Sequence, residues 1–408
     1  MGKIDELIKE LCPDGVEYVK LGEICEIYDG THQTPKYVNE GIPFISVENI
    51  QNIYGSQKFI SIDDYDSYKV KPQLGDMFMT RIGTIGTCAI VNKQEDIAYY
   101  VSLALLRPKH SIVNVGYLKH LIESNIGVNE IRKHSLLHAV PIKINKNDIC
   151  KIQIPLPPLS IQQQIVEILD TFTDSISNLQ EELELREKQM EYYRESLLSF
   201  DGEKVEYIKL SEICNITDYV AAGSFASLRE KVLYLKEGYA HLVRTTDLKQ
   251  NFKNKEDFVY VSKEAFDFLW RVNLNCECVI LPNIGNCGEV YYISPNVLKH
   301  TFNVLGPNAI KVESNNNNNK FLFYLFHGKD FQNEIRKITS KAGQPKFNKT
   351  NLKEIRIPVP SLSRQQEIVN ILDTFESMIA NIKEEIELRQ KQYEYYREKL
   401  LTFERKEA

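Results

Sequence analysis

The chain has 408 residues, which exceeds one ordinary domain and predicts two to four domains. Its composition, 43% hydrophobic and 26% charged, is typical of soluble globular proteins, and no apolar run approaches the ~18 residues of a membrane helix. The first residues lack signal-peptide character, so we expect a cytoplasmic protein.

The net charge of −6 by itself argues against a nucleic-acid partner. Residues 159–200 carry nine acidic and three basic side chains, and residues 362–403 carry eight and six. The remainder of the chain therefore has a net charge of +2. Because the acidity is confined to two segments, the other segments can still bind DNA.

The eight cysteines form no C-x-x-C pair, and no histidine lies at zinc-binding spacing from them. Cys276 and Cys278 are one residue apart, which in a strand places both side chains on one face. This pattern favours buried or free thiols in a reducing cytosol over a structural metal, so no metal is expected.

The first half of the chain reads as a mixed α+β domain. Val19, Leu21 and Ile24 form an alternating pattern that predicts an opening strand. Further strands are expected at residues 43–47 and 75–80, and helical stretches are expected near residues 115–132 and, in the second half, near residues 320–337.

An I-G-x-x-G motif occupies residues 82–86, and it recurs at residues 284–288. It resembles a KH clamp or a phosphate loop, but hydrophobic residues follow both copies where such loops require a helix. A turn that connects two strands is the better interpretation. The residues that precede each turn, such as Arg81 and Asn283, could still point at DNA.

Residues 159–201 are predicted to form one long helix. Prolines end the preceding segment, and Ser160-x-x-Gln163 has the pattern of a capping box. Apolar residues then recur in steps of four and three from Ile165 onward, interrupted at Arg186, which is typical of a coiled-coil seam. About 36 residues at ~1.5 Å each predict a rod of roughly 54 Å.

The second half of the chain repeats this plan at an offset of 203 residues. Residues 357–403 match residues 154–200 at 31 of 47 positions, with a second capping-box pattern at Ser363 and Gln366 and a second interruption at Arg389. A match of this length means a duplicated structural unit.

The similarity extends beyond the helices, because residues 16–25 recur at residues 205–214. We expect a pseudo-two-fold repeat of mixed α/β domains and long helices. Its predicted boundaries are 1–158 for the first domain, 159–201 for the first helix, 202–361 for the second domain and 362–408 for the second helix.

A helix with such an exposed apolar seam needs a partner. The nearest equal partner is the other copy in the same chain, and an antiparallel coiled coil would relate the copies by a pseudo-two-fold axis. The alternative is that each helix recruits a helix of another protein.

Loops rich in Thr, His, Gln, Ser, Lys and Arg are the candidates for contact with bases and phosphates, because those side chains match groove edges and the backbone. In the first half these are Thr31, His32, Gln33, Lys36, Arg81, Thr84, His134, Ser135 and His138. In the second half they are Ser224, Arg229, Arg244, Thr245, Asn283, Asn286, Lys299, His300, Lys341, Gln344 and Lys346. Each residue alone could equally be a solvated loop residue.

Motifs of catalysis are missing from the sequence. There is no N/D-P-P-Y/F methyltransferase tetrad, no G-x-x-x-x-G-K-[ST] phosphate loop and no paired base and nucleophile. Asp14 followed by Glu17 lacks the E-x-K of a nuclease core. We therefore expect no catalytic residue and no cofactor bound by this chain.

The doubled block I-P-x-P-x-L-S-x-Q-Q-x-I-V-x-I-L-D, each copy followed by a long helix rich in Glu, Lys and Arg, resembles the specificity subunit of type I restriction–modification systems. The opening G-V-E-Y-V-K-L-G-E-I is also typical of that family, and the resemblance covers essentially the whole chain.

The resemblance implies two target recognition domains that each read one half of a bipartite, asymmetric DNA sequence. It implies that the helical pair sets the spacer and docks two modification (methyltransferase) subunits, which would carry S-adenosylmethionine and methylate adenine. Restriction subunits would add ATP- and Mg-dependent translocation and cleavage. The two Glu-Tyr-Tyr-Arg-Glu segments are the candidate docking surfaces, through Tyr192, Arg194, Tyr395 and Arg397.

Two other functions fit parts of the sequence. One is a coiled-coil scaffold that binds no DNA, which would show no salt-sensitive DNA affinity. The other is the recognition part of a single-chain restriction–methyltransferase, whose catalytic domains would lie outside this chain.

Overall fold

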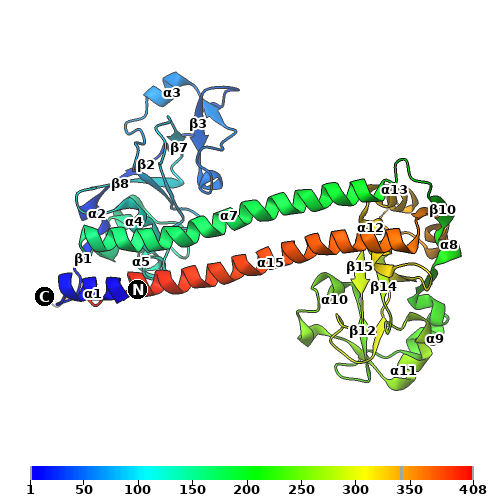
Figure 1. The fold of residues 1–408 in the computed structure, drawn as a ribbon. Helices are drawn as coiled ribbons and strands as arrows, with labels where there is room; N and C mark the ends of the chain where they lie inside the picture. The colour runs from blue at the N-terminus through cyan, green and yellow to red at the C-terminus, as the bar shows by residue number, and fades with distance from the viewer. Residues whose placement is uncertain (1, 341–342, 407–408) are drawn as a thin grey trace. The chain divides into compact units, whose positions relative to one another are not determined.

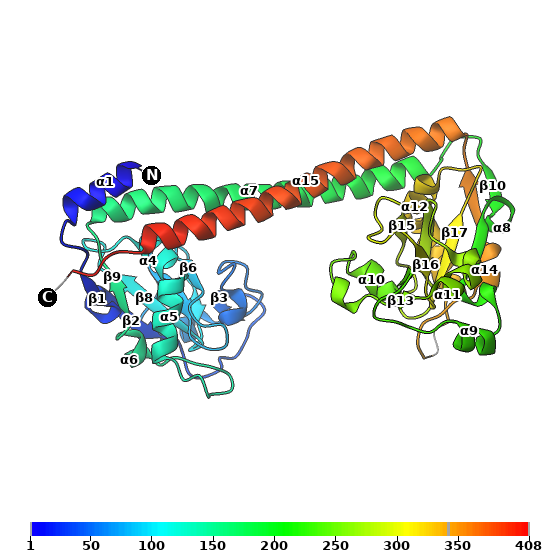
Figure 2. The same ribbon diagram turned by 90° about the horizontal axis from the view of Figure 1, so that it is seen from below.

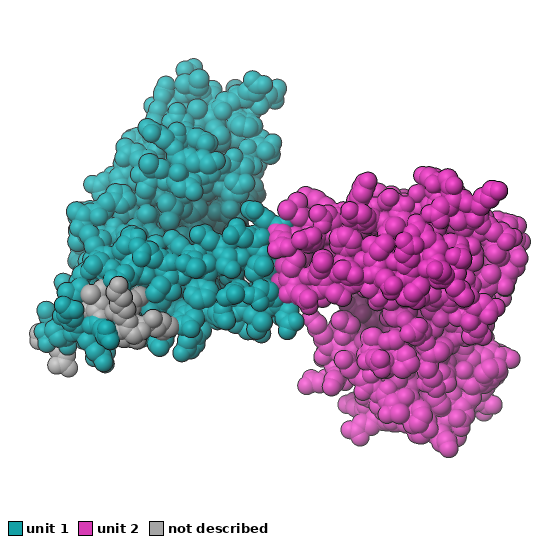
Figure 3. All heavy atoms as spheres, in the orientation of Figure 1, with its two compact units in different colours: residues 1–181, 384–408 teal, residues 182–383 magenta. Residues whose placement is uncertain are grey.

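The computed structural model describes residues 2–340 and 343–406, and its contacts divide the chain into two compact units (Figure 3). Unit 1 comprises residues 1–181 and 384–408, and unit 2 comprises residues 182–383. Each long helix therefore belongs partly to one unit and partly to the other. The part of the chain that the structure describes contains no helix of the length and apolarity that a membrane span needs.

Unit 1 contains a mixed α/β domain. Its elements are α1 (Gly2–Leu11), β1 (Tyr18–Lys20), α2 (Leu21–Ile24), β2 (Cys25–Asp29), β3 (Ile42–Ile45), η1 (Val47–Asn49), β4 (Phe59–Ile60), α3 (Ile62–Asp66), β5 (Met77–Thr80), β6 (Cys88–Ile90), β7 (Ala98–Tyr99), β8 (Leu103–Pro108), α4 (Val115–Ile122), α5 (Asn125–His134), α6 (Lys146–Ile149) and β9 (Gln153–Pro155). Its sheets have the orders β2-β8-β5-β6, β4-β3-β7 and β1-β9.

Unit 2 repeats this topology. Its elements are β10 (Glu206–Lys209), α8 (Leu210–Ile213), β11 (Asn215–Asp218), η2 (Tyr219–Ala222), α9 (Phe225–Lys231), β12 (Ala240–Val243), α10 (Thr245–Lys249), η3 (Lys255–Asp257), β13 (Tyr260–Val261), α11 (Lys263–Phe268), η4 (Trp270–Val272), β14 (Cys278–Pro282), β15 (Tyr291–Ile293), β16 (Asn303–Leu305), β17 (Ala309–Glu313), α12 (Asn319–His327), α13 (Lys329–Ile338), α14 (Lys349–Lys353) and β18 (Arg356–Val359). The sheets β11-β17-β14-β15, β13-β12-β16 and β10-β18 correspond one by one to those of unit 1.

One local prediction for the first domain needs correction. The opening strand ends at Lys20, because Leu21–Ile24 forms the short helix α2. The helical stretch expected near residues 115–132 is confirmed and consists of two helices, α4 and α5; the hydroxyl of Ser124 caps α5 by accepting the N–H of Gly127. A Cβ at Gly127 would lie 2.3 Å from the carbonyl oxygen of Leu121, so the close approach of the two helices requires glycine there.

The I-G-x-x-G motifs are turns between strands, as predicted. Residues 83–86 connect β5 to β6, and residues 285–288 connect β14 to β15. The glycines at both ends of each motif adopt positive φ, at +76° and +94° in the first copy and +84° and +108° in the second. That backbone region favours glycine, which explains the spacing without a phosphate ligand.

Two helices of 40 residues each, α7 (Leu159–Leu198) and α15 (Leu362–Leu401), carry the heptad pattern, and each is ~60 Å long at 1.5 Å per residue. In unit 1 the ring of Phe172 stacks on Tyr396 at 5.3 Å, and in unit 2 Tyr193 stacks on Phe375 at 5.2 Å. A shift of 203 residues interchanges these two pairs. The predicted antiparallel coiled coil and its internal pseudo-two-fold repeat are therefore confirmed (Figure 1).

The predicted capping boxes at Ser160 and Ser363 are wrong, because both residues already lie inside the helices. The side-chain oxygen of Gln163 instead accepts the amide of Asn114 at 2.8 Å, and Gln366 accepts that of Asn318 at 2.9 Å. Asn114 and Asn318 are the N-caps of α4 and α12. The glutamine that recurs in both copies thus ties each long helix to the domain before it rather than capping the helix's own first turn.

The neighbouring glutamines, Gln162 and Gln365, are buried between each long helix and its domain. Gln162 accepts the main-chain N–H of Asn114 at 2.8 Å and donates to the carbonyl oxygens of Ile112 and Pro157. Gln365 repeats the first of these bonds with Asn318 at 2.9 Å. Both amides satisfy main-chain groups that would otherwise be buried without a partner.

The domain and helix ends share one hydrophobic core in each unit. In unit 1, Ile165 and Leu169 of α7 and Leu400 of α15 are buried in the same cluster as the domain helices. In unit 2, Leu198 of α7 and Leu372 of α15 have this role. Each domain therefore packs on the first half of one long helix and the last half of the other (Figure 2).

We expect Gln162→Leu to destabilise unit 1 by about 1–3 kcal/mol, because leucine leaves buried main-chain groups without hydrogen bonds. Denaturant unfolding monitored by hydrogen exchange at α4 measures the loss. Gln180→Leu on the exposed face of α7 is the control and should change stability little. A Gln162→Leu protein as stable as the control would show that these bonds contribute nothing.

Candidate nucleic-acid interface

Three polar loops of unit 1 meet at the ends of the four-stranded sheet. The turn at residues 83–86 is hydrogen-bonded to the loop after α5, since the N–H of Gly83 donates to the carbonyl oxygen of Ile142 at 2.9 Å. That loop closes on itself through a bond of 2.8 Å from the N–H of Leu136 to Lys143. The predicted DNA contacts of the first half lie on these loops and on the segment that follows β2.

Arg81 holds these loops together. Its side chain is almost buried and forms an ion pair with Asp29 at the end of β2, and its Nε donates to the carbonyl oxygen of Ile144 at 3.2 Å. Because the Arg81 guanidinium binds both partners, it fixes the positions of the turn, the end of β2 and the loop after α5 relative to one another. It therefore positions its exposed neighbours.

Unit 2 assembles the same loops with different residues. Asn283, at the position of Arg81, donates to the carbonyl oxygen of Phe347 at 3.1 Å, and Gly285 donates to Pro345 at 2.8 Å. Asp218, at the position of Asp29, pairs with Lys349 at 2.8 Å. The hydrogen bonds that hold the loops together are kept in both units, whereas the cation paired with the aspartate is Arg81 in unit 1 and Lys349 in unit 2. The two loop clusters therefore present different surfaces.

The predicted contact residues differ in exposure. His32, Gln33, Lys36, Thr84, His138, Ser224, Arg229, Asn286, Lys299, Gln344 and Lys346 are exposed. Thr31, His134, Ser135, Arg244, Thr245, Asn283 and His300 are half-buried, Arg81 is buried, and Lys341 lies outside the described residues. Nothing in the structure tests contact with DNA, so all of them stay predictions.

Arg244, Thr245, Lys299 and His300 lie on a different part of unit 2 from the turn at residues 285–288. They flank the sheet β13-β12-β16. Arg244 is held there by Asp247 at 2.8 Å. Burial by itself would raise the pKa of Asp247, but His241 and the paired Arg244 lower it to about 2. The Arg244 guanidinium is therefore fixed beside a permanent carboxylate.

A hollow of about 460 Å³ lies beside the loop cluster of unit 2. Arg229 and Asn283 line it together with the rings of Tyr219 and Tyr234. This hollow joins α9 to the turn region, so Arg229 and Asn283 form one surface although 54 residues separate them in the chain.

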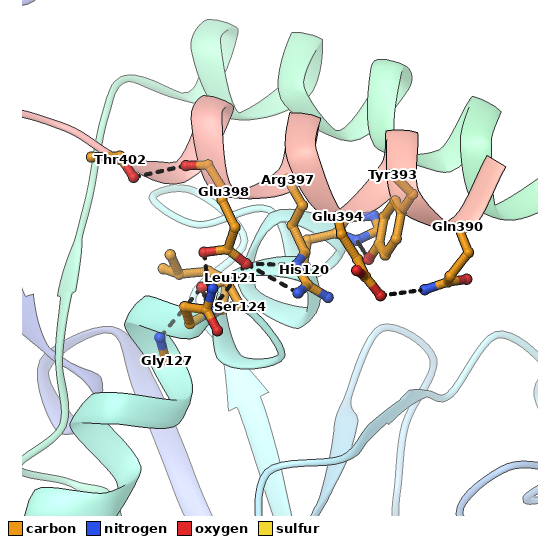
Figure 4. A network of polar contacts seen from close by, with 11 residues as sticks. His120, Leu121, Ser124, Gly127, Gln390, Tyr393, Glu394, Arg397, Glu398 and Thr402 are labelled. Carbon is orange, nitrogen blue, oxygen red and sulfur yellow. Dashed lines mark hydrogen bonds and ion pairs between the residues drawn. The ribbon is translucent and has the colours of Figure 1, made fainter. Parts of the chain in front are cut away.

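The junction of the first domain with the two long helices contains a buried histidine (Figure 4). His120 of α4 has Nε2 at 2.8 Å from Asp170 of α7 and Nδ1 at 3.0 Å from the hydroxyl of Tyr393 of α15. The pKa of His120 is lowered chiefly because burial desolvates the imidazolium, although Asp170 opposes this shift. One side chain thus joins three elements.

A carboxylate completes the junction. Glu398 of α15 accepts the N–H of Asn125, the first residue of α5, at 3.1 Å and is paired with Arg397 at 3.0 Å (Figure 4). In unit 2, Glu195 of α7 accepts the N–H of Lys329 at the start of α13 at 3.2 Å. Carboxylates stabilise helix N-termini, so the last turn of each long helix fixes the domain at the other helix's start.

The four predicted docking residues separate into two groups. Tyr192 and Tyr395 are 69% and 62% exposed, and both lie on the outer faces of the long helices. Arg194 and Arg397 are half-buried and paired with Glu195 and Glu398. The tyrosines are available to a partner, whereas the arginines belong to the junctions.

A sequence model described as "Type I restriction modification DNA specificity domain" matches residues 13–186 and again residues 202–388. The chain belongs to this family. The resemblance seen in the sequence is confirmed, and the two matched segments correspond to the two copies of the repeat.

Several relatives are named as type I specificity subunits. The specificity subunit of the EcoR124I/EcoR124II type I restriction enzyme of Escherichia coli is 31% identical over 281 residues, 63% of this chain and 64% of that protein. The chain therefore spans slightly less than two thirds of that relative. A putative type I specificity subunit of Mycoplasma pneumoniae is 24% identical over 94% of this chain and 97% of its own length.

A solved structure has the same fold. The crystal structure of the S subunit of a type I restriction–modification system from M. genitalium matches 95% of this chain and 96% of its own, with a TM-score of 0.58 at 15% identity. The chain thus shares its fold with that subunit.

We expect the stability of unit 1 to fall as the pH drops through about 6.5, because the unfolded chain protonates His120 at its ordinary pKa while the folded state resists protonation until a lower pH. His120→Gln should reduce the loss of stability between pH 7.5 and pH 5.5, measured by hydrogen exchange at α4. The exposed His32→Gln is the control. Equal acid losses in wild type and His120→Gln would contradict this assignment.

Proposed function

We propose that this chain is the DNA-recognition subunit of a type I restriction–modification complex and has no catalysis of its own. Each of its two domains reads one half of a bipartite, asymmetric target. The observation that carries this proposal is the duplicated loop cluster, one copy in each unit, with a common framework and divergent exposed side chains.

The loop framework supports recognition because the residues that position the loops are different from the exposed residues that would contact DNA. Arg81 in unit 1 and Asn283 in unit 2 fix the loops from inside, which leaves exposed residues such as His32, Gln33 and Arg229 free to face a duplex. Side chains of these types can hydrogen-bond base edges or phosphates. Different exposed residues on the same framework would read different half-sites.

The long helices suit the role of a ruler. Half-site readers must sit at a set phase on the duplex, where one turn is ~34 Å, and a paired helix of ~60 Å keeps its length. The helices are also the acidic part of the chain, so they do not compete with the loops for phosphates. We infer that they set the unspecific spacer between the half-sites.

The outer faces of the helices suit partner subunits. Leu185 and Tyr192 are exposed one heptad apart on α7, and Leu388 and Tyr395 repeat this stripe on α15. Exposed apolar residues at that spacing fit a helix of another protein. We infer that two methyltransferase subunits dock here, one on each stripe.

Chemistry would then reside on the partners. The methyltransferase subunits would hold S-adenosylmethionine and methylate adenine, and restriction subunits would use ATP and Mg²⁺. Across residues 2–340 and 343–406 the structure contains no group of three His, Cys, Asp or Glu side chains suited to a metal ion.

Methylome sequencing of a host that expresses the system tests the readers. We expect one modified motif split into two parts, and we expect that replacing residues 1–158 by those of a relative changes only one part. The rods are untouched by that exchange, so the spacer should stay the same. A continuous motif, or a change in both parts, would contradict two independent readers.

Tyr192→Ala and Tyr395→Ala test docking. We expect each substitution to weaken one of two methyltransferase sites by about tenfold or more, because exposed aromatic anchors dominate such interfaces. Titration calorimetry with the purified methyltransferase subunit measures stoichiometry and affinity. Asn178→Ala, on an exposed part of α7, is the control. Equal binding by all variants would show that these exposed tyrosines are not part of the interface.

A further inference from the structure

The last described residues of the chain add an extended segment to the first domain. In unit 1 the N–H of Val16 donates to the main-chain carbonyl oxygen of Glu404 at 2.9 Å, and the N–H of Lys406 donates to that of Val16 at 3.0 Å. The hydroxyl of Tyr18 donates to the carbonyl oxygen of Phe403 at 3.2 Å. The tail is therefore held through its main chain, in the manner of an added strand.

One side chain of the tail covers the neighbouring surface. The guanidinium of Arg405 lies 5.1 Å from the centre of the Tyr18 ring, and it donates to the side-chain oxygen of Gln153 at 3.2 Å. The contact combines a cation over an aromatic face with a hydrogen bond. Unit 1 thus has a strand edge and a side-chain site, and both are occupied.

Unit 2 has the same edge without the tail. Val205, Tyr207 and Arg356 hold the positions of Val16, Tyr18 and Gln153 in the repeat. No hydrogen bond within the described parts of the chain engages the main-chain N–H or C=O of Val205. Tyr207 is 51% exposed, whereas Tyr18 is half-buried beneath the tail.

The chain that leaves α7 does not take the place of the tail. Glu203, just after the end of the helix, pairs with Arg364 at the start of α15 at 3.0 Å. A groove of about 800 Å³ consequently lies beside Tyr207 in unit 2. It is lined by residues that include Leu198, Tyr207, Lys329, Lys337, Arg356 and Pro358.

The lining of the groove carries both signs of charge, with Glu195, Asp330, Glu334 and Glu354 beside Lys329, Lys337 and Arg356, and the position of Arg356 disfavours a second copy of the tail. Where Gln153 accepts a hydrogen bond from Arg405, unit 2 presents the guanidinium of Arg356, which would repel another arginine. Among the described residues Arg356 has no acidic partner, and it donates to the carbonyl oxygen of Tyr207 at 3.0 Å. A carboxylate at the position of Arg405 would complement it.

We propose that the groove of unit 2 binds an extended segment of a methyltransferase subunit. Its main chain pairs with Val205, as the tail pairs with Val16, and an acidic side chain lies against Tyr207 and reaches Arg356. This inference rests on the proposed docking of methyltransferase subunits and adds a second, strand-like contact to the helical one. It makes the two domains unequal toward their partners.

Hydrogen exchange at single-amide resolution on the full chain, with and without the purified methyltransferase subunit, tests the proposal. We expect the amide of Val205 to slow at least tenfold in the complex. The amide of Val16 is the internal control, because it is already bonded to Glu404 and should not change.

A charge reversal tests the side-chain site. Arg356→Glu should weaken methyltransferase binding by about tenfold, because an attraction becomes a repulsion. Arg336→Glu is the matched control, since Arg336 lies on α13 and does not line the groove. Equal affinity of Arg356→Glu and Arg336→Glu would overturn the acidic contact.

The remaining outcomes separate the two proposals. A complex that forms while exchange at Val205 stays unchanged overturns the groove and leaves the docking proposal intact. Absence of any complex overturns both. Self-association of the chain that disappears when residues 403–408 are deleted would assign the groove to a second copy and overturn the choice of partner.

Discussion

A single helix of 40 residues with an apolar seam along most of its length cannot remain exposed to water, and the rest of this molecule follows from how that seam is covered. The chain carries the seam twice, and α7 and α15 cover each other. In an antiparallel pair, a contact between the start of one helix and the end of the other recurs with the helices interchanged. The stacked pairs Phe172–Tyr396 and Tyr193–Phe375 are such a recurring contact. Each domain then finds the start of one helix and the end of the other.

Polar contacts at these junctions determine how firmly each domain is held. A hydrophobic contact between a domain and two helices would tolerate sliding, whereas a buried amide or imidazole requires its partners at fixed distances. Gln162 and Gln365 supply the amide in both units, and Glu398 and Glu195 supply the carboxylate at a helix N-terminus. A reader of DNA needs this rigidity, because its loops must keep their register on the duplex.

Within this symmetric frame the two copies differ where function needs a difference. His120 and Tyr393 in unit 1 are replaced in unit 2 by Tyr324, which donates to Asp373 at 2.6 Å, and by Met190. Arg81 is replaced by Asn283, and Gln153 by Arg356. The first change leaves an imidazole at only one of these two contacts, and the others exchange a charged side chain for a neutral one or the reverse. The two helix-bearing segments keep 31 of 47 positions identical, and most seam positions stay apolar in both copies because each seam packs in both units.

The sequence alone determined the duplication, the long helices and the resemblance to the family, because heptad spacing and a repeat of 31 identities in 47 positions are local and periodic signals. It predicted the antiparallel pairing but left partners from another protein open, and the stacked pairs of the structure decided between them. The sequence also placed the strand-connecting turns, because glycine spacing reports backbone conformation directly. Tertiary structure alone decided that Gln163 bonds Asn114 instead of capping its own helix, that Arg81 is engaged internally, and that His120 joins α4 to both helices. Each of these contacts joins residues that are far apart in the chain. The packing of the hydrophobic seams decides which distant group a polar side chain contacts, and the spacing of residues in the sequence does not predict that group.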